Sequence, residues 1–328
     1  MNERGKAAWT LALLSTALAE LVTASTLPLA FYNPVFFLLL LGMYGGGVLL
    51  VREFLVRLNK GPASLLALGL AYAILEEALI LRSWFDPNYP NVQGLGWYGR
   101  VAGINTLWAL WVTPLLALIA NAIPIFFTSL LFPNLNGTPL LSKRQLAFPC
   151  ASLAAVAGVT RILPQTYVTG PLEYGLAVAL ALALVAIAFR LPRDLYRPRA
   201  AAPPRRAWPL LLFGGVWTAF DFFLYQLGPA VGYHPMFSVV LMLAAPAFVG
   251  LALPSLLHPA TWRQQLYLFF AGVMGFFAVM DLLRGLTSGP VGLTVVGAGF
   301  LIAARLLYRE VWPSQSSGQE GPAPKSAA

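Results

Sequence analysis

The amino-acid sequence predicts an all-α, polytopic integral membrane protein with about ten transmembrane helices. Of its 328 residues, 59% are apolar and 10% are charged, and the mean hydropathy is +0.73. A soluble domain carries about 25% charged residues. Apolar stretches of about 20 residues recur along the whole chain, which is the length that crosses a bilayer as a helix. Because hydrocarbon offers no hydrogen bonds, such stretches must satisfy their backbone groups internally.

Ten apolar segments account for most of the chain. Their limits follow from the apolar runs and from the Pro and Gly turns between them. The expected spans are residues 8–30, 35–57, 62–82, 104–131, 145–163, 171–191, 208–228, 236–257, 264–284 and 289–308.

The distribution of basic residues predicts the orientation. If the spans alternate in direction, only four of the 21 Lys and Arg residues face away from the amino-terminal side, namely Arg82, Arg100, Arg161 and Arg284. By the positive-inside rule, both termini are expected in the cytoplasm. The net charge of +9 then reflects topology and contact with anionic membrane lipids, and no nucleic-acid partner is expected. We expect a multi-pass protein of the plasma membrane.

Composition also divides the chain into segments. We expect a six-span bundle at residues 1–191 with an outer loop at 83–103, a basic cytoplasmic linker at 192–207, a four-span bundle at 208–312 and a disordered tail at 313–328. The single cysteine, Cys150, allows no internal disulfide. Two histidines are too few for a Cys/His metal site, so we expect no metal and no cofactor. Nothing in the sequence specifies an oligomeric state.

Glu76 and Glu77 are the most informative residues, because they lie side by side near the end of an apolar span. Insertion scales put the cost of one carboxylate at the bilayer centre at about 2.5–3.5 kcal/mol. On an α-helix, consecutive side chains point about 100° apart. This spacing groups Tyr72 and Ser83 with Glu76 and places Glu77 on the next face. We expect one carboxylate to face a cavity and the other to bind a neighbouring helix.

A structural interpretation competes with this functional one. In it, each glutamate pairs with an arginine, for which Arg82, Arg100 and Arg161 are the candidates. We favour a functional site, because ionisable residues inside membranes are costly and commonly mark pathways for ions, protons or substrates.

Further candidates lie in the outer loop and in a later span. The loop interleaves aromatic residues with polar ones, which suits a segment that caps a carboxylate site as well as an anchor at the bilayer interface. Glu20, near the middle of the membrane, suits a ligand and a structural partner equally. The candidate substrate or proton site residues are Glu76, Glu77, Arg82, Asp86, Arg100 and Asp221.

One helix resembles the membrane-embedded CAAX-type proteases, whose hallmark is a Glu-Glu pair followed by an arginine and by two histidine motifs. Here the arginine, Arg82, stands one place late, and the motifs around His234 and His258 lack the family's other residues. The likeness therefore carries no catalytic histidine.

A closer resemblance covers about the first 135 residues. The stretches GGGVLLVREFLVR from Gly45, LGLAYAILEEALILRSWFDP and WYGRVAGINTLWA are similar to an uncharacterised family of bacterial and archaeal polytopic membrane proteins. That resemblance implies a membrane fold and no particular activity.

Three functions remain open from the sequence. The favoured one is a transporter or permease-like protein for a small solute or lipid-like substrate, with an outward-facing carboxylate site at Glu76 and Glu77. The alternative is an enzyme acting on a lipid or lipid-linked substrate at the outer leaflet, with one glutamate as general base and Arg82 and Arg100 holding the head group. A non-catalytic membrane scaffold is the third.

Overall fold

The structure is a computed structural model that describes residues 1–162, 167–198, 207–232, 234–287 and 289–313. It confirms the all-α fold, since its only strands are β1 (Arg100–Val101) and β2 (Ile104–Asn105) within those ranges. In chain order the helices are α1 (Glu3–Thr16), α2 (Pro28–Phe31), α3 (Pro34–Leu40), α4 (Gly46–Arg57), α5 (Pro62–Ile74), α6 (Thr106–Leu116), α7 (Ile123–Leu131), α8 (Ala147–Ile162), α9 (Pro171–Arg190), α10 (Trp208–Val231), α11 (Pro235–Leu256), α12 (Trp262–Thr287) and α13 (Leu293–Val311).

Seven helical stretches in the described ranges are long and apolar enough to cross a membrane. They are Pro34–Arg57, Pro62–Ile80, Thr106–Leu131, Pro171–Arg190, Trp208–Gly228, Pro235–Leu256 and Trp262–Thr287. The apolar helix α8 is shorter, and α1 and α13 each carry several charged residues. A multi-pass membrane protein follows, while the tenfold crossing and the orientation stay predictions.

The first helix ends earlier than expected. The sequence predicts a span over residues 8–30, but the helix that begins at Glu3 stops at Leu21. Ala24 then adopts a left-handed backbone with φ of 52°, and the Thr26 N–H donates to the Glu20 carbonyl at 3.0 Å. Pro28 opens α2, and a proline fixes its own φ and disfavours helical geometry in the residue before it. A turn therefore interrupts an apolar stretch that composition alone reads as continuous.

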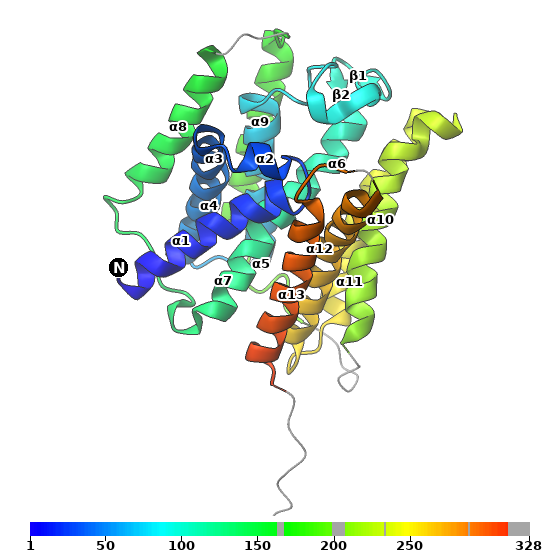
Figure 1. Cartoon of the computed structure of the whole chain (residues 1–328). Coiled ribbons are helices and arrows are strands. Elements are labelled where there is room, and N and C mark those ends of the chain that lie inside the picture. The colour runs from blue at the N-terminus through cyan, green and yellow to red at the C-terminus, as the bar shows by residue number, and fades with distance from the viewer. Residues whose placement is uncertain (163–166, 199–206, 233, 288, 314–328) are drawn as a thin grey trace, which may run out of the picture.

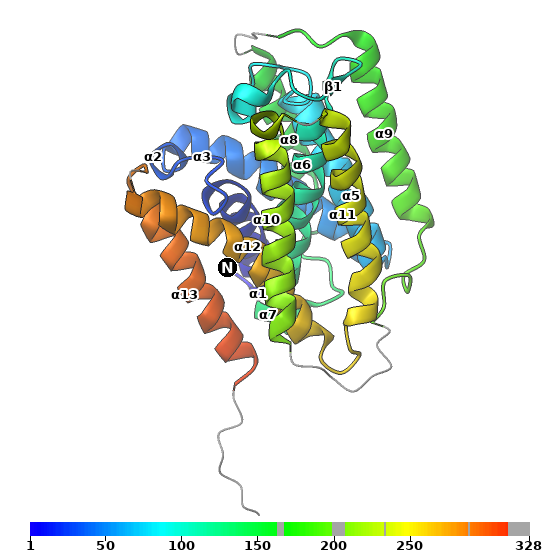
Figure 2. The ribbon, with the colours of Figure 1, turned by 90° about the vertical axis from the view of Figure 1, so that its right-hand side faces the viewer.

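The helices form one bundle with a shared core. Figure 1 shows α1–α4 on one side and α10–α13 on the other, and Figure 2 places α9 and α13 on opposite flanks. Between α10 and α12, Gly214 and Gly272 allow close approach, since a Cβ on either would lie about 2 Å from a backbone oxygen of the other helix (2.2 and 2.0 Å). Trp111 of α6 stacks on Tyr225 of α10 at 6.3 Å between ring centroids. The expected linker and tail lie largely outside the described residues, at 199–206 and 314–328.

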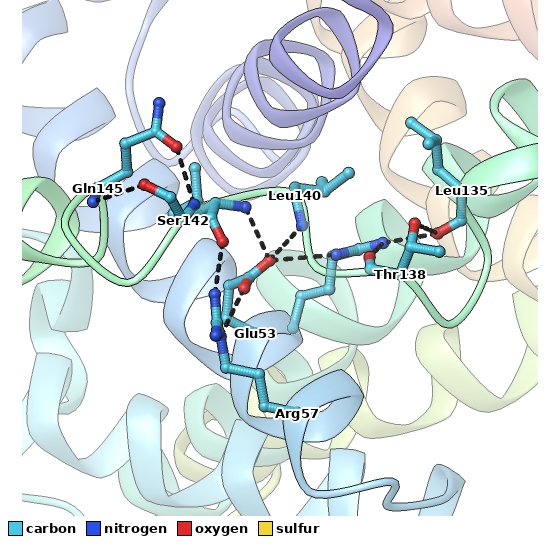
Figure 3. A network of polar contacts seen from close by, with 9 residues as sticks. Glu53, Arg57, Leu135, Thr138, Leu140, Ser142 and Gln145 are labelled. Carbon is cyan, nitrogen blue, oxygen red and sulfur yellow. Dashed lines mark hydrogen bonds and ion pairs between the residues drawn. The ribbon is translucent and has the colours of Figure 1, made fainter.

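A buried ion network fixes one end of the bundle (Figure 3). Glu53 of α4, whose side chain is 1% exposed, pairs with Arg52 at 3.3 Å and with Arg57 at 2.9 Å. The same carboxylate accepts from the backbone N–H groups of Leu140 and Leu141 at 2.6 and 3.2 Å. Both arginines also donate to carbonyls of the segment that follows α7. One carboxylate therefore ties the α7–α8 connection to the end of α4.

We expect Glu53→Gln to lower the free energy of unfolding by about 3 kcal/mol, because it leaves two arginines without their buried counter-charge. The measurement is unfolding of the purified protein in mixed micelles. Asp194→Asn is the matched control, since the Asp194–Arg197 pair is more than half exposed on both sides and exposed pairs contribute little. Equal loss in the two variants would contradict a structural role for the Glu53 network.

Candidate functional site

Four π-helical segments meet in the amino-terminal half of the described structure. They are Ala17–Leu21, Leu41–Gly45, Leu75–Ile80 and Ala117–Ala122. In each, the hydrogen bonds span five residues in place of four, as in the 2.8 Å bond from the Leu81 N–H to the Glu76 carbonyl. Such wide turns are rare and recur at functional sites.

Each π-helical segment carries a buried polar side chain. These are Glu20 in the first segment, Tyr44 in the second, Glu76 and Glu77 in the third and Asn121 in the fourth. Ser15 of α1 joins two of the segments, because its hydroxyl donates to the Ala120 carbonyl at 2.6 Å and lies 3.3 Å from the Tyr44 carbonyl. Glu20, Glu76 and Glu77 together form what we call the carboxylate cluster.

Glu20 is the hydrogen-bonded member of the cluster on the α1 side. The Tyr44 hydroxyl donates to its Oε1 at 2.5 Å, and the Thr26 hydroxyl donates to its Oε2. Thr26 is available because the chain turns back after Leu21. The early end of the first helix therefore supplies one of the two donors that Glu20 requires.

Glu76 is fully buried, and neither of its carboxyl oxygens has a hydrogen-bond partner among the described residues. Tyr44 and Tyr72 are its polar neighbours. Each tyrosine hydroxyl has one proton to donate, and both are committed elsewhere. Tyr44 donates to Glu20, and Tyr72 donates to the Met43 carbonyl at 2.8 Å. Glu76 therefore lies near two hydroxyl groups whose protons are already used, and no hydrogen bond joins it to either.

Glu77 faces a different set of groups. The Ser83 hydroxyl donates to Glu77 Oε2, and the Trp108 indole N–H donates to Ser83 Oγ at 2.9 Å. The expectation that the two glutamates serve different faces fits this geometry, but Ser83 belongs to Glu77 and not to Glu76. The cause is the wide π turn followed by the left-handed backbone of Arg82, φ 61°, which together break the helical spacing.

No arginine of the described residues neutralises the cluster. Within the described ranges the ion pairs involve only Glu53 and Asp194 as carboxylates, so none reaches Glu20, Glu76 or Glu77. Arg82 is directed toward α8, where it donates to the Thr160 carbonyl at 3.3 Å. Burial, and secondarily the nearby charge of Arg161, lower the pKa of Arg82. Arg161 lies over the Tyr174 ring at 5.2 Å.

Arg100 organises the outer loop. Its guanidinium donates to the carbonyls of Phe85 at 2.6 Å, Gly103 at 2.5 Å and Gly96 at 3.1 Å. Arg100 begins β1, which pairs with β2 in a hairpin. The two turn residues, Ala102 and Gly103, have positive φ, as a tight hairpin turn requires. These bonds leave Arg100 as a structural centre of the loop.

The loop folds down onto the bundle above Glu77. Asn105 is the N-cap residue of α6. Its side chain donates to the Leu95 carbonyl, and its backbone N–H donates to the Trp84 carbonyl. Asp86 accepts from the Asn88 N–H at 2.8 Å and so shapes the first turn of the loop. Burial, followed by the charge of Glu77, raises the pKa of Tyr89 well above its usual range, which places this loop residue in electrostatic reach of the cluster.

Asp221 lies outside the carboxylate cluster, on α10. It is buried, and its Oδ1 has no hydrogen-bond partner among the described residues. Asp281 lies on α12, which packs against α10, and is also buried. Its Oδ2 has no hydrogen-bond partner among the described residues. The structure therefore gathers Glu76, Glu77 and the loop with Asp86 and Arg100 at one place, and leaves Arg82 directed away and Asp221 on another helix.

A large cavity of about 960 Å³ lies beside the fourth π-helical segment. Its walls include Leu66 and Leu70 of α5, Ala117 and Ala122 of the fourth π-helical segment, and residues of α10–α12. The same π-helical segment contacts the one that carries Glu20. One irregular segment therefore separates the cavity from the carboxylate cluster.

Sequence reasoning singled out the two glutamates and their loop but missed Tyr44 and Trp108. Aromatic side chains occur in many membrane spans, so no local pattern marks these two residues.

Comparison with known proteins gives one finding. The model of a family described as an uncharacterized membrane protein family matches residues 10–199, which confirms the expected resemblance and extends it beyond residue 135. No curated protein and no solved structure matches the chain.

The position of Tyr72 depends on Gly47. A Cβ at residue 47 would lie 2.1 Å from a carbon of the Tyr72 ring. We expect Gly47→Ala to displace Tyr72 from the Met43 carbonyl and to lower the free energy of unfolding by about 1–3 kcal/mol, the usual range for overpacking.

Gly175→Ala is the matched control, because nothing lies within 4 Å of a Cβ at that helical position. It should leave stability equal or raise it by up to about 1 kcal/mol, since alanine is the better helix former. Thermal unfolding of both variants in the same detergent tests this, and a Gly47→Ala protein as stable as the control would refute the packing argument.

Proposed function

This chain belongs to the uncharacterized membrane protein family, and we propose that it is a proton-coupled transporter of the plasma membrane whose coupling site is the carboxylate cluster. The observation that carries the proposal is Glu76, a fully buried carboxyl group with no cation and no hydrogen-bond donor among the described residues. An ionised carboxylate in such a place costs several kcal/mol. A protonated one costs far less, because it carries no charge to desolvate.

In this proposal, the structure with its enclosed carboxylate cluster is the form in which Glu76 carries a proton. Release of the proton creates a buried charge that the surroundings do not compensate, which favours an arrangement with water at the cluster. The four π-helical segments supply backbone that can change its hydrogen bonding there. The outer loop closes the cluster at one end, and the 960 Å³ cavity lies beyond the fourth π-helical segment. The expected orientation makes this an inward-facing form.

Secondary transporters typically open a site within the membrane to one side and then to the other, and broken helices surround that site. Here the breaks are the π-helical segments and Pro114 inside α6. The carboxylates serve as the intramembrane proton carriers, as ionisable residues in pumps and transporters do.

The direct test is charge displacement after a pH jump in membranes that contain the purified protein on a solid support. It needs no substrate, because proton binding to the cluster itself moves charge. We expect a transient in the wild-type protein and loss of this transient in Glu76→Gln/Glu77→Gln. The control is Glu310→Gln, an exposed carboxylate on α13, which should keep the transient.

Glutamine mimics the protonated carboxyl group, so we expect Glu76→Gln to unfold with a free energy within about 1 kcal/mol of wild type. A loss of about 3 kcal/mol or more would identify Glu76 as one partner of a buried charged pair and would contradict the proposal.

One observation favours an enzyme as the second candidate. Ser83 Oγ is held between the Glu77 carboxylate and the Trp108 indole, which is the arrangement of a nucleophile beside a base. A groove of about 440 Å³ runs past the third π-helical segment and is lined by Leu79, Ala157 and Arg161. In this reading Glu77 takes the Ser83 proton as Ser83 Oγ attacks an ester carbonyl of a lipid at the outer leaflet. The alcohol leaves with that proton, and water then hydrolyses the acyl-serine. Arg100 already donates to loop carbonyls, so in this reading Arg161 binds the head group of the lipid.

Ser83→Ala separates the two candidates. A transporter keeps its pH-jump transient in this variant, because the carboxyl groups remain. An enzyme loses the altered lipid that its overexpression produces in cells, as measured by lipid mass spectrometry against the wild-type protein. If Ser83→Ala loses the transient but its cells have the same lipid profile as cells with the wild-type protein, both assignments of Ser83 are contradicted.

A further inference from the structure

The cavity of about 960 Å³ has the character of a binding site in its own right. It lies between the amino-terminal helices and α10–α12, at the end of the bundle that carries Lys60. Its volume is at the upper end of the range of pockets that hold one drug-sized molecule, roughly 300–1,000 Å³. The wall is mainly apolar and includes Leu118, Val249, Leu253 and Phe269. The interior therefore suits a hydrocarbon body.

The rim of the same cavity is basic. Lys60, Arg193 and Arg197 line it, together with one carboxylate, Asp194. Asp194 pairs with Arg197 at 2.6 Å, and both side chains are more than half exposed. Three cations face one anion, so the rim has net positive charge. Ser129, another lining residue, has its carbonyl bound by a fourth cation, Arg263, at 3.2 Å.

The rim cations differ in their availability to a ligand. Lys60 donates to the carbonyls of Phe189 and Leu191 and so holds the end of α9 in place. The side chains of Arg193 and Arg197 are exposed. Guanidinium groups bind carboxylates and phosphates through paired charge-assisted hydrogen bonds. The two arginines are therefore the groups that can receive an anionic head.

We propose that this cavity binds a single-chain amphiphile with one anionic head group, its chain between α5 and α10–α12 and its head at Arg193 and Arg197. The single apolar volume favours one chain, and the net charge of the rim favours an anion over a neutral or cationic head. As the cargo of transport, this ligand rests on the proposed function. As a bound ligand, it does not depend on it.

Tryptophan fluorescence reports on the cavity directly, because Trp217 and Trp262 line it. The experiment uses the full chain in phosphatidylcholine nanodiscs at alkaline pH, titrated with bromine-labelled stearic acid, which quenches nearby indoles. We expect saturable quenching that is largely lost in Trp217→Phe/Trp262→Phe, which removes both indoles of the cavity wall. Brominated stearyl alcohol, with the same chain and a neutral head, should bind at least about tenfold more weakly, the equivalent of one charge-assisted hydrogen bond.

Arg193→Gln/Arg197→Gln should weaken binding of the acid about tenfold and leave binding of the alcohol unchanged. Arg161→Gln, which removes a cation at the smaller groove, is the matched control and should bind the acid as the wild type does. Equal quenching by acid and alcohol, or quenching that persists in Trp217→Phe/Trp262→Phe, would overturn the proposal. Dibrominated phosphatidylglycerol that quenches Trp217 as strongly as the acid would assign the cavity to a bilayer phospholipid and also overturn it.

Binding and transport fail separately in this design. Glu76→Gln/Glu77→Gln should bind the acid normally, because both residues lie outside the cavity wall. A wild-type protein that binds the acid but gives no pH-jump transient would support the cavity ligand and contradict the proposed function. A transient without acid binding would do the reverse.

Discussion

The arrangement of the amino-terminal half depends on the cost of enclosing Glu76. A carboxyl group without a cation or a donor is tolerated in the interior only while it carries a proton. The two neighbouring tyrosine protons are used by Glu20 and by the Met43 carbonyl. Among the described residues, no cation pairs with Glu76 and no hydrogen bond reaches its oxygens. These surroundings support the proposal that Glu76 carries a proton while it is enclosed.

Two networks of hydrogen bonds and ion pairs frame this site. At one end, Glu53 fastens the α7–α8 connection to α4 with two arginines and two backbone N–H groups. At the other end, Arg100 gathers three loop carbonyls and holds the loop over Ser83 and Glu77. Between them, the helices are interrupted by π turns at the level of the buried polar residues. The proposed function places its conformational change in this irregular middle.

Hydropathy predicted the all-α membrane fold and most helix limits, because each apolar run is a local property of the chain. The cost of adjacent carboxylates in such a run also singled out Glu76 and Glu77, and the mixed loop composition singled out the segment that covers them. The assignment of Ser83 to Glu76 was wrong, since it assumed α-helical spacing across a π turn that no sequence period signals. The first span was drawn too long for a related reason, because the turn after Leu21 consists of ordinary residues.

Other features depend on contacts between distant segments and could not be predicted. Tyr44 and Trp108 meet the glutamates from other helices, and the large cavity exists only where two groups of helices come together. The sequence treated Arg52 and Arg57 only as basic charge on the cytoplasmic side, and the structure adds that both pair with the buried Glu53.

Infrared difference spectroscopy of Glu76 tests the central claim most directly. The purified protein in lipid, compared with Glu76→Gln at neutral pH, should show the carbonyl stretch of one protonated carboxylic acid that the variant lacks. The frequency should shift on exchange into heavy water, as an acid proton requires. If the difference spectrum instead contains the two bands of an ionised carboxylate, Glu76 is charged in its enclosed state, and the account of the cluster given above is wrong.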